Sequence, residues 1–361
     1  MLRDRRILFY VPEGNLSTNG VYASQVGGLA KYCESLGAKT LIWDNALKGH
    51  RWFYQTIGRM RLAARENAQL VSFGPTHIYA RTYSSCLAAK ELAKKTGAKL
   101  IYSMRGADVA EELMAKNFRG YVIAADAAWC VRRAIKAADH INAVSQTMAK
   151  WIERKFRKTA SVLPCCVAGG IKADGWPKEC DEKTIVYSGG LSAWQKIDTI
   201  IRLMKRISEA DASIRFRFLT KDLEALKEKC ESIGLDAGRW AAKSCMPSEV
   251  AAELMKADCG IILRDNTLVN QVASPIKIGE YLSAGLGLIA SPFIGDVGKD
   301  LADMDFACLI DESAPVEKVV SFVKSMNHEK RRQAVQWVEN HLAYESNKDV
   351  VFGMFYMMDN A

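Results

Sequence analysis

Short apolar strands alternate with helical stretches along most of the chain, and this order restricts the fold more than any other feature of the sequence. Strand, helix and strand in succession predict a parallel sheet with helices on both faces. The helices are long enough for right-handed crossovers. In the first half, the expected strands are Ile7–Val11, Lys39–Trp43, His77–Ala80, Lys99–Ser103, His140–Val144 and Ser161–Leu163, and the expected helices lie near 20–36, 51–68, 84–95, 109–136 and 146–156.

The alternation is interrupted at Cys165–Lys183, where glycines, a proline and charged residues break any period. It then restarts, so the second half predicts a second domain of the same kind. The fold class is therefore α/β, with two Rossmann-like doubly wound domains that face a cleft at the carboxyl ends of their strands. The second set of expected strands is Thr184–Ser188, Ile214–Leu219, Cys259–Leu263, Gly287–Ala290 and Phe306–Leu309, with helices near 196–210, 222–233, 247–257, 275–285, 313–326 and 328–342.

The length of 361 residues also indicates two domains, because it exceeds what one ordinary core accommodates. We expect an N-terminal domain at 1–165, a linker at 166–182 and a C-terminal domain at 183–343. The last segment, 344–361, is apolar and aromatic on much of its surface and cannot stay in water. We expect it to form a helix that returns to the first domain.

The composition is that of a soluble protein, with 49% hydrophobic and 25% charged residues. No apolar run approaches the roughly 20 residues that span a bilayer, and the N-terminus leads into a strand instead of a signal peptide. Ten cysteines without metal-ligand spacing indicate reduced thiols, and the five histidines include no pair at zinc-binding spacing. We therefore expect a cytoplasmic protein without a bound metal or cofactor.

The formal net charge of +9 favours anionic partners, which include nucleotides, phospholipid headgroups and nucleic acids. The positive residues are spread along the chain without a DNA- or RNA-binding motif, so a nucleic acid is not an expected partner. A basic segment with aromatic and apolar residues, 48–65, has two interpretations. It is a helix on a membrane surface, or a helix packed on the sheet with its arginines in water.

The stretch from Ser274 to Glu280 has the pattern of a helix start. Ser274 is expected to cap the first turn and Pro275 to take its first position, with Ile276 following. Lys277 falls where the helix dipole disfavours a cation, unless an anion such as phosphate lies there. Glu280 lies about 7–8 Å along the helix from the proline, the reach from a diphosphate to ribose hydroxyls. The alternative is a capped surface helix with a Lys277–Glu280 pair.

The loop after the fourth expected strand concentrates charge, because Arg105 is followed by Asp108, Glu111 and Glu112. Arginine can bind a phosphate or carboxylate bidentately, while the acids can accept sugar hydroxyls. Arg105, Asp108 and Glu112 are therefore the candidate catalytic residues. In the alternative interpretation, the acids only complement the N-terminus of the next helix.

Three other loops at expected strand ends, 12–20, 187–198 and 264–271, are polar and suited to ligand binding. Glycines in the first two let the backbone approach a ligand closely. The first loop has no GxGxxG pattern, and a plain connection is the alternative there. The candidate binding residues in these loops are Asn19, Gly20, Gly189, Gly190, Lys196, Arg264 and Asn266.

Two segments together resemble the GT-B glycosyltransferases of the family 4 type. One is Tyr187-Ser188-Gly189-Gly190-Leu191 followed by Lys196-Ile197-Asp198, and the other is Ser274-Pro275-x-Lys277-x-Gly279-Glu280-Tyr281-Leu282-x-x-Gly285. The resemblance covers most of the chain and is strongest over residues 184–291. It implies two Rossmann-like domains, with the acceptor on the first and a sugar nucleotide mainly on the second. It also implies sugar transfer with retention and without a bound metal.

The resemblance implies roles for individual residues. Lys196 would contact the donor phosphates, Glu280 would contact the ribose, and the 273–277 loop would give amides to the diphosphate. The family commonly has arginine where Gly190 stands and an acid where Val272 stands. This chain therefore departs from the family pattern at one phosphate contact and at the contact with the transferred sugar.

The sequence thus predicts a retaining, metal-independent hexosyltransferase that uses a nucleoside-diphosphate sugar and a glycan or polyprenyl-linked acceptor. Its Ser-Pro-x-Lys form is similar to that of bacterial surface-polysaccharide transferases, which implies polysaccharide biosynthesis at the inner face of the cell membrane. Two alternatives stay open. One is a GT-B sugar-nucleotide epimerase, and the other is a non-catalytic protein that binds a sugar nucleotide.

Overall fold

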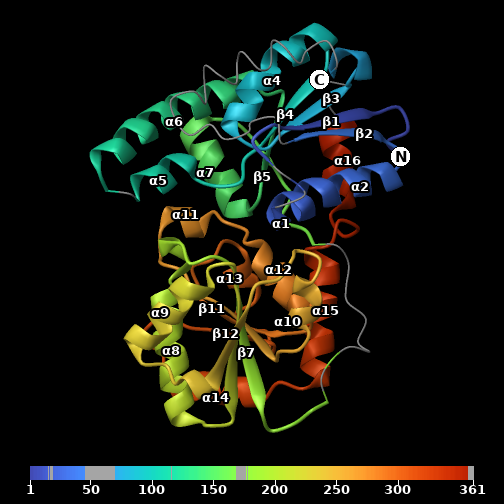
Figure 1. Cartoon of the computed structure of the whole chain (residues 1–361). Coiled ribbons are helices and arrows are strands. Elements are labelled where there is room, and N and C mark those ends of the chain that lie inside the picture. Colours follow the sequence, from blue (N-terminus) through green and yellow to red (C-terminus); the bar gives the residue numbers. More distant parts are fainter. Residues whose placement is uncertain are drawn as a thin grey trace. The chain divides into compact units, whose positions relative to one another are not determined.

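The chain forms two compact units (Figure 1), and the computed structural model describes residues 1–14, 16, 19–44, 70–114, 116–167, 176 and 178–356. The segment 48–65, and with it the helix expected near 51–68, lies outside the described residues. Unit 1 contains Met1–Ala168, Val272–Ser274 and Tyr344–Ala361, and unit 2 contains Gly169–Gln271 and Pro275–Ala343.

The centre of unit 1 is a six-stranded sheet in the order β2-β1-β3-β4-β5-β6, in which all neighbouring strands are parallel. Parallel neighbours need crossover connections, which the intervening helices supply. The alternation in the sequence correctly predicted this sheet. Its strands are β1 (Arg6–Val11), β2 (Lys39–Asp44), β3 (His77–Ala80), β4 (Lys99–Ser103), β5 (His140–Ala143) and β6 (Ser161–Val162).

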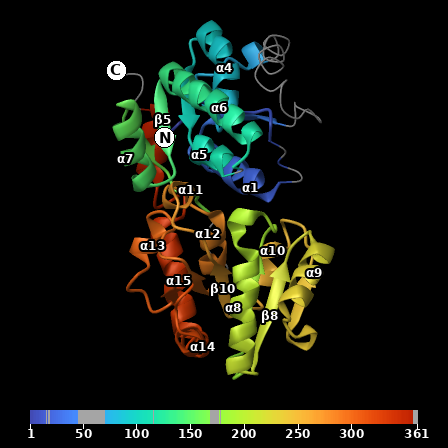
Figure 2. The same ribbon diagram turned by 90° about the vertical axis from the view of Figure 1, so that its left-hand side faces the viewer.

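Helices cover both faces of this sheet (Figures 1 and 2). Successive side chains of a strand point to opposite faces, so Leu8 and Tyr10 of β1 join the core with α4, α6 and α7. Ile7 and Phe9 join the opposite core with α2 and α16. The helices among the described residues of unit 1 are α1 (Gly20–Tyr22), the π-helix η1 (Ala23–Gly27), α2 (Gly28–Ser35), α4 (Tyr83–Thr96), α5 (Asp108–Leu113), α6 (Phe118–Ala137), α7 (Gln146–Phe156) and α16 (Lys348–Tyr356).

The C-terminal helix belongs to unit 1, although the chain reaches it from unit 2. Val351, Met354 and Phe355 of α16 are fully buried in the core that also contains Ile7 and Phe9. The expected return of this apolar segment to the first domain is confirmed.

Unit 2 contains a second six-stranded parallel sheet, in the order β12-β11-β10-β7-β8-β9. The half-exposed edge strand β9 was not expected, because its sequence, Trp-Ala-Ala-Lys, contains no β-branched residue and two alanines, which are depleted in strands. The strands are β7 (Lys183–Ser188), β8 (Ile214–Leu219), β9 (Trp240–Lys243), β10 (Cys259–Ile262), β11 (Gly287–Ala290) and β12 (Ala307–Leu309).

One face of this sheet packs on α8, α9 and α14 through a core that includes Ile185, Tyr187 and Phe216. On the other face, a Cβ at Gly260 would overlap the ring of Tyr281 in α12. The helices of unit 2 are the 3-10 helices η3 (Ala193–Gln195) and η4 (Ala237–Arg239), with α8 (Ile197–Ala210), α9 (Leu223–Ile233), α10 (Val250–Leu254), α11 (Leu268–Gln271), α12 (Ile276–Ser283), α13 (Val297–Asp300), α14 (Val316–Lys324) and α15 (His328–His341).

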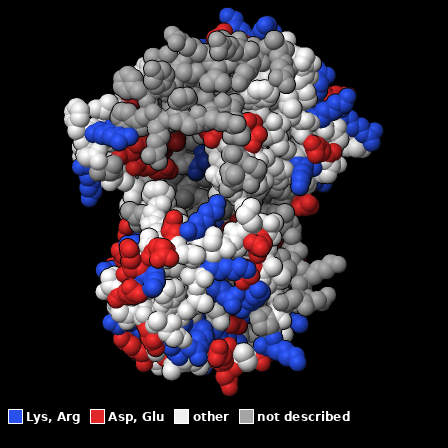
Figure 3. Space-filling view, in the orientation of Figure 1, with Lys and Arg blue, Asp and Glu red and all other residues white. Residues whose placement is uncertain are grey.

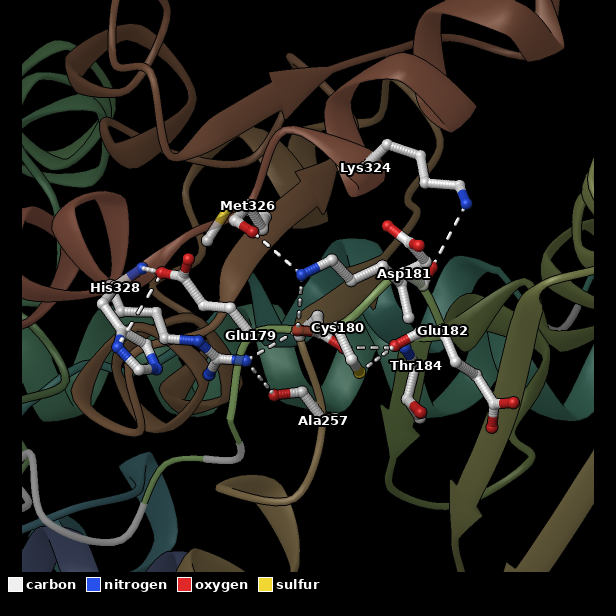
Figure 4. Close-up of polar contacts among 12 residues, drawn as sticks. Glu179, Cys180, Asp181, Glu182, Thr184, Ala257, Lys324, Met326 and His328 are labelled. Atoms are coloured by element: carbon white, nitrogen blue, oxygen red, sulfur yellow. Dashed lines mark hydrogen bonds and ion pairs between the residues drawn. The ribbon is translucent and has the colours of Figure 1, made fainter.

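A buried ionic network holds the amino ends of β7 and β10 (Figure 4). Lys183 Nζ donates to the carbonyl of Met326 at 3.0 Å and lies 3.6 Å from Asp258. Arg331 of α15 donates to Asp258 at 2.8 Å and to the carbonyl of Ala257 at 2.9 Å. Each buried charge has an opposite charge beside it, which offsets its desolvation. This network lies at the end of the sheet opposite to the strand ends where ligands bind in such folds.

Three expected elements differ from the structure. The single helix expected at 109–136 is two helices, because Asn117 caps α6 by accepting the N–H of Gly120 at 2.8 Å. The helix expected near 247–257 is only α10. Ser274 does not cap the helix that follows it: the N-cap of α12 is Pro275, without a side-chain cap.

Candidate functional site

A glycine turn follows β7 and forms the base of the site in unit 2. Gly189 has φ +140°, a conformation that residues with a Cβ rarely adopt. A Cβ at this position would also collide with Nζ of Lys277. Tyr187, at the end of β7, donates its hydroxyl to the carbonyl of the exposed Gly190 at 2.5 Å. The turn therefore lets an ammonium group approach the backbone closely.

Lys277 comes from the first turn of α12, whose N–H groups have no partner within the helix. Its ammonium donates to Gln195 Oε1 at 2.8 Å and lies over the ring of Tyr187, 4.6 Å from the ring centre. The position of α12 is set by Tyr281, whose hydroxyl accepts the N–H of Ser188 at 2.8 Å. The side chain of Lys277 is thus held beside the glycine turn.

Arg264 follows β10 and is 7% exposed. It donates to the carbonyls of Trp194 and Leu263, each at 3.1 Å, and to Gln195 Oε1 at 2.7 Å. A guanidinium has more donors than these contacts use. Lys277 and Arg264 therefore share one amide oxygen, at the carboxyl ends of neighbouring strands.

The two cations have no carboxylate in hydrogen-bond contact among the described residues. Burial, and then the charge of Arg264, lowers the pKa of Lys277 to about 7, although Glu280 opposes the shift. Burial also lowers the pKa of Arg264. A neutral amide oxygen cannot compensate two positive charges, so an anion at this position would be stabilised. Elsewhere on the face of unit 2 seen in Figure 3, basic and acidic side chains are interspersed.

Glu280 lies one turn further along α12. Burial raises its pKa, and the charge of Lys277 opposes this rise. The structure thus brings Gly189, Lys277, Arg264 and Glu280 into one region of unit 2. Lys277 and Glu280 lie one turn apart on α12, and Arg264 reaches the same region from the loop after β10.

Lys196 is already neutralised, in contrast to Lys277. It donates to Asp265 at 2.6 Å and forms a second ion pair with Glu312. Burial alone would lower its pKa, but the hydrogen bonds to these two carboxylates raise it. Asn266, beside Asp265, accepts from Gln271 Nε2 at 2.7 Å and is exposed.

The expected residues at the start of α12 have separate places. Ser274 belongs to unit 1, where its hydroxyl accepts the N–H of Cys165 at 3.0 Å. Pro275 and Ile276 belong to unit 2 and begin the helix. The prediction that Ser274 caps the helix was wrong because its oxygen has this tertiary partner.

The other expected site residues lie in unit 1. Asn19 is the N-cap of α1, where its Oδ1 accepts the N–H of Val21 at 3.0 Å, and Gly20 begins the helix. Arg105 follows β4 and donates to Gln25 Oε1 at 2.6 Å. A second positive side chain, Arg81, interacts electrostatically with Arg105.

Asp108 and Glu111 form the first turn of α5, with Glu112 following. Burial, and then the charge of Glu111, raises the pKa of Asp108 to about 7. Burial and the charge of Glu112 also raise the pKa of Glu111. The acids therefore lie at a helix N-terminus, as the alternative interpretation expects. Burial, and then the neighbouring carboxylates, favour the protonated form of Asp108.

Sequence reasoning did not identify Gln195, Tyr187 or Arg81. Arg81 directly follows the correctly predicted strand β3, so the rule that selected Arg105 would have selected it as well. Gln195 precedes Lys196 but carries no charge, and only the fold shows that two cations meet at its side chain. Within the described ranges, no group of three or more His, Cys, Asp or Glu side chains could hold a metal ion.

An apolar surface is exposed on unit 1 at α5 and α6. Phe118 is 83% exposed and Trp129 is 53% exposed, and both lie on the outer side of α6. Arg133 lies over the ring of Trp129, 4.3 Å from its centre. The structure shows no helix in its described portion that is both long and apolar enough to cross a membrane. The large apolar residues of this surface are Leu113, Met114, Phe118, Tyr121, Val122 and Trp129.

Comparisons of the sequence with protein-family models and with curated proteins found no match. Solved structures do match over almost the whole chain. A glycosyltransferase from Rickettsia africae has a TM-score of 0.69 at 11% identity, and the match covers 99% of both chains. A sucrose-phosphate synthase from Thermosynechococcus elongatus has a TM-score of 0.71 at 12% identity, with 98% of both chains covered. Anabaena HepE, in complex with UDP and glucose, has a TM-score of 0.65 at 11% identity, with 99% of this chain and 100% of HepE covered.

At these identities the matches show the fold alone. The two parallel six-stranded sheets are the two Rossmann-like domains of the GT-B fold, as the sequence predicted.

Proposed function

We propose that the protein is a retaining, metal-independent glycosyltransferase of the family 4 type. It moves a sugar from a nucleoside-diphosphate sugar to a glycan or a lipid-linked glycan in polysaccharide biosynthesis. The observation that carries this proposal is the pair Lys277 and Arg264, which share a neutral amide oxygen beside a glycine turn. Such a pair fits the diphosphate of a donor. The GT-B fold, which this chain shares with the glycosyltransferase from Rickettsia africae, supports sugar transfer.

In this reaction the bond between the anomeric carbon and the diphosphate oxygen breaks, and a new bond forms to an acceptor hydroxyl oxygen. The electron pair of the broken bond stays on the departing diphosphate, and an oxygen of that diphosphate takes up the proton of the acceptor hydroxyl. Lys277 and Arg264 would stabilise the negative charge that develops on the leaving group. Glu280 would accept the ribose hydroxyls. These two protein cations supply the positive charge that the leaving group needs.

UDP is the first ligand to test, because HepE of the same fold holds UDP and glucose. A ligand that binds the folded state raises its melting temperature. We expect UDP, GDP or ADP to raise the melting temperature of the full chain. The matching sugar nucleotide should then release the nucleoside diphosphate when a glycan acceptor is added.

The same experiment separates the alternatives. A sugar-nucleotide epimerase would act without an acceptor, and UDP-N-acetylglucosamine is its simplest probe. Binding without turnover of any donor would favour the non-catalytic protein. Failure of all three nucleoside diphosphates to bind would contradict the proposal.

We also propose that the protein is cytoplasmic and contacts the inner face of the cell membrane through the exposed surface of α5 and α6. Aromatic and apolar residues flanked by cations suit the interface of an anionic bilayer. Arg132, Arg133 and Lys136 are exposed at the other end of the same side of α6. The surface therefore complements both the acyl region and the acidic headgroups, which fits a lipid-linked acceptor.

Flotation with vesicles of phosphatidylglycerol and phosphatidylcholine tests this contact. The double variant Phe118→Ser, Trp129→Ser should lose most of the bound fraction. Each Å² of apolar surface that enters the bilayer contributes about 25 cal/mol to binding, and the variant removes most of the aromatic surface. Met246→Ser, which removes a 60% exposed side chain in unit 2, is the matched control and should bind as wild type does. Equal binding of all three proteins would contradict the contact.

A further inference from the structure

A second pair of cations lies in unit 1. Arg81 directly follows β3, and Arg105 follows β4 after one intervening residue. These strands are parallel neighbours, with Ala80 opposite Tyr102. Both arginines therefore emerge at the carboxyl edge of the sheet, where open α/β folds bind ligands.

The guanidinium of Arg105 has only neutral partners among the described residues. It donates to Gln25 Oε1 at 2.6 Å and to Cys165 Sγ at 3.1 Å, with a weaker contact to Ser103 Oγ at 3.5 Å. Its Nε is buried without a hydrogen-bond partner. A buried donor without a partner costs free energy that a bound acceptor would recover.

Gln25 is held in place on the protein side. Its Nε2 donates to the carbonyl of Cys166 at 2.7 Å, which fixes the direction of Oε1. It lies in the π-helix η1, a form that is frequent at functional sites. The hydroxyl of Tyr344 donates to the carbonyl of Gln25 at 3.4 Å from the C-terminal segment. The amide therefore positions Arg105 without neutralising it.

Arg81 lies over the ring of Tyr22, which is a neutral partner, 4.8 Å from the ring centre. Burial lowers its pKa, and the charge of Arg105 lowers it further. Glu13, close in sequence to Tyr22, accepts from the hydroxyl of Thr82 at 2.9 Å. No ion pair joins either arginine to a carboxylate in the described part of the chain.

We propose that Arg81 and Arg105 bind an oxyanion, a carboxylate or a phosphate, carried by the acceptor. Two adjacent guanidinium groups match such a group bidentately. Unit 2 already contains cations and a carboxylate for a nucleotide, so the arginine pair of unit 1 is left for a second anionic group. The inference names the acceptor class and rests on the proposed function: the acceptor is an acidic sugar or a sugar linked through phosphate.

The test uses the full chain saturated with UDP and measures binding by calorimetry. Glucuronic acid probes the carboxylate, glucose 1-phosphate probes the phosphate linkage, and glucose is the uncharged control. We expect at least one anionic sugar to bind more tightly than glucose. Arg105→Gln and Arg81→Gln should each weaken that binding at least tenfold, and Lys227→Ala, at an exposed lysine of unit 2, should leave it unchanged. Arg105→Lys keeps the charge but loses the planar fork, so it should recover only part of the affinity.

Three outcomes would overturn the inference. The first is that neither anionic sugar binds the wild-type protein more tightly than glucose does. The second is that the arginine variants bind the anionic sugar as wild type does, with unchanged melting temperatures. The third is that Arg105→Gln weakens UDP binding as much as Lys277→Ala does, which would assign the pair to the nucleotide.

If UDP does not bind but the anionic sugar binds through Arg105, the proposed nucleotide site fails and the oxyanion site stands. The two failures are therefore distinguishable.

Discussion

The carboxyl edges of the two sheets carry similar groups with different acid–base properties. Unit 2 places Lys277 and Arg264 around Gln195, and unit 1 places Arg105 beside Gln25 with Arg81 nearby. In each unit, the side-chain amide of a glutamine positions a cation. Among the described residues, no carboxylate contacts that cation. One pair, however, contains a lysine, whereas the other consists of arginines alone.

This difference decides which edge responds to pH. Burial and a neighbouring charge lower the pKa of Lys277 to about 7, so its charge changes near neutral pH. An arginine starts from a far higher pKa and stays charged under the same conditions. Lys277 should therefore make anion binding at the edge of unit 2 pH-dependent, whereas the two arginines of unit 1 keep their charge.

The largest expected effect comes from removal of the lysine. Lys277→Ala should weaken UDP roughly 10- to 100-fold, because a hydrogen bond to a charged group contributes about 1.5–3 kcal/mol. Binding of uridine, which has no phosphate, should change little. Calorimetry with both ligands checks this, and Lys227→Ala, at an exposed lysine of the same unit, is the matched control. An equal loss for UDP and uridine would refute a charge role.

The pH dependence is the next largest effect. The anion requires the ammonium form, so UDP binding takes up a proton when Lys277 starts neutral. Affinity should fall about tenfold from about pH 7.5 to 8.5, where the UDP phosphate, with a second pKa of about 6, is fully ionised. Lys277→Arg should remove most of this dependence. A wild-type affinity that is constant across this range would remove the contrast between the two edges.

Glu280→Gln should have a smaller effect, roughly three- to tenfold on UDP, since one hydrogen bond contributes about 1 kcal/mol. The loss should be similar for uridine, because the carboxylate faces the ribose in our proposal. The measurement is the pair of dissociation constants. If Glu280→Gln weakens the binding of UDP but not of uridine, Glu280 acts on the diphosphate or through Lys277 instead.

The smallest effect should come from Lys196→Ala. Its ammonium is already paired with Asp265 and Glu312, so less than about a threefold change in UDP affinity is expected, as for most surface ion pairs. Calorimetry on this variant and on Lys277→Ala compares the two lysines directly. A loss at Lys196 as large as that at Lys277 would show that it exchanges its carboxylates for the phosphates, as the family resemblance implies.

Much of the fold was predictable because its signals are local. An apolar strand, a polar loop and an amphipathic helix each appear within about ten residues, and their order dictates parallel sheets. The bounds expected for β3, β4, β8 and β11 agree with the structure. The strand β9 was missed because its residues have little preference for strands. The expected cap at Ser274 failed because its hydroxyl binds a residue distant in the sequence.

The candidate site was only partly predictable. The sequence identified Lys277, Arg264, Gly189 and Glu280 as candidates, because strand ends and helix starts are recognisable locally. The sequence also identified Lys196 as a candidate for phosphate binding. A lysine beside a glycine turn looks the same in the sequence whether or not a carboxylate neutralises its charge.

The sequence by itself determined that two parallel α/β domains form and that cations follow their strands. Only the tertiary structure decided which cations keep their charge available. Asp265 and Glu312, which pair with Lys196, lie 69 and 116 residues away in the chain. The oxygen that Lys277 shares with Arg264 is 82 residues away. Electrostatic interactions depend on distance in space, and that distance is set only when the strands have paired.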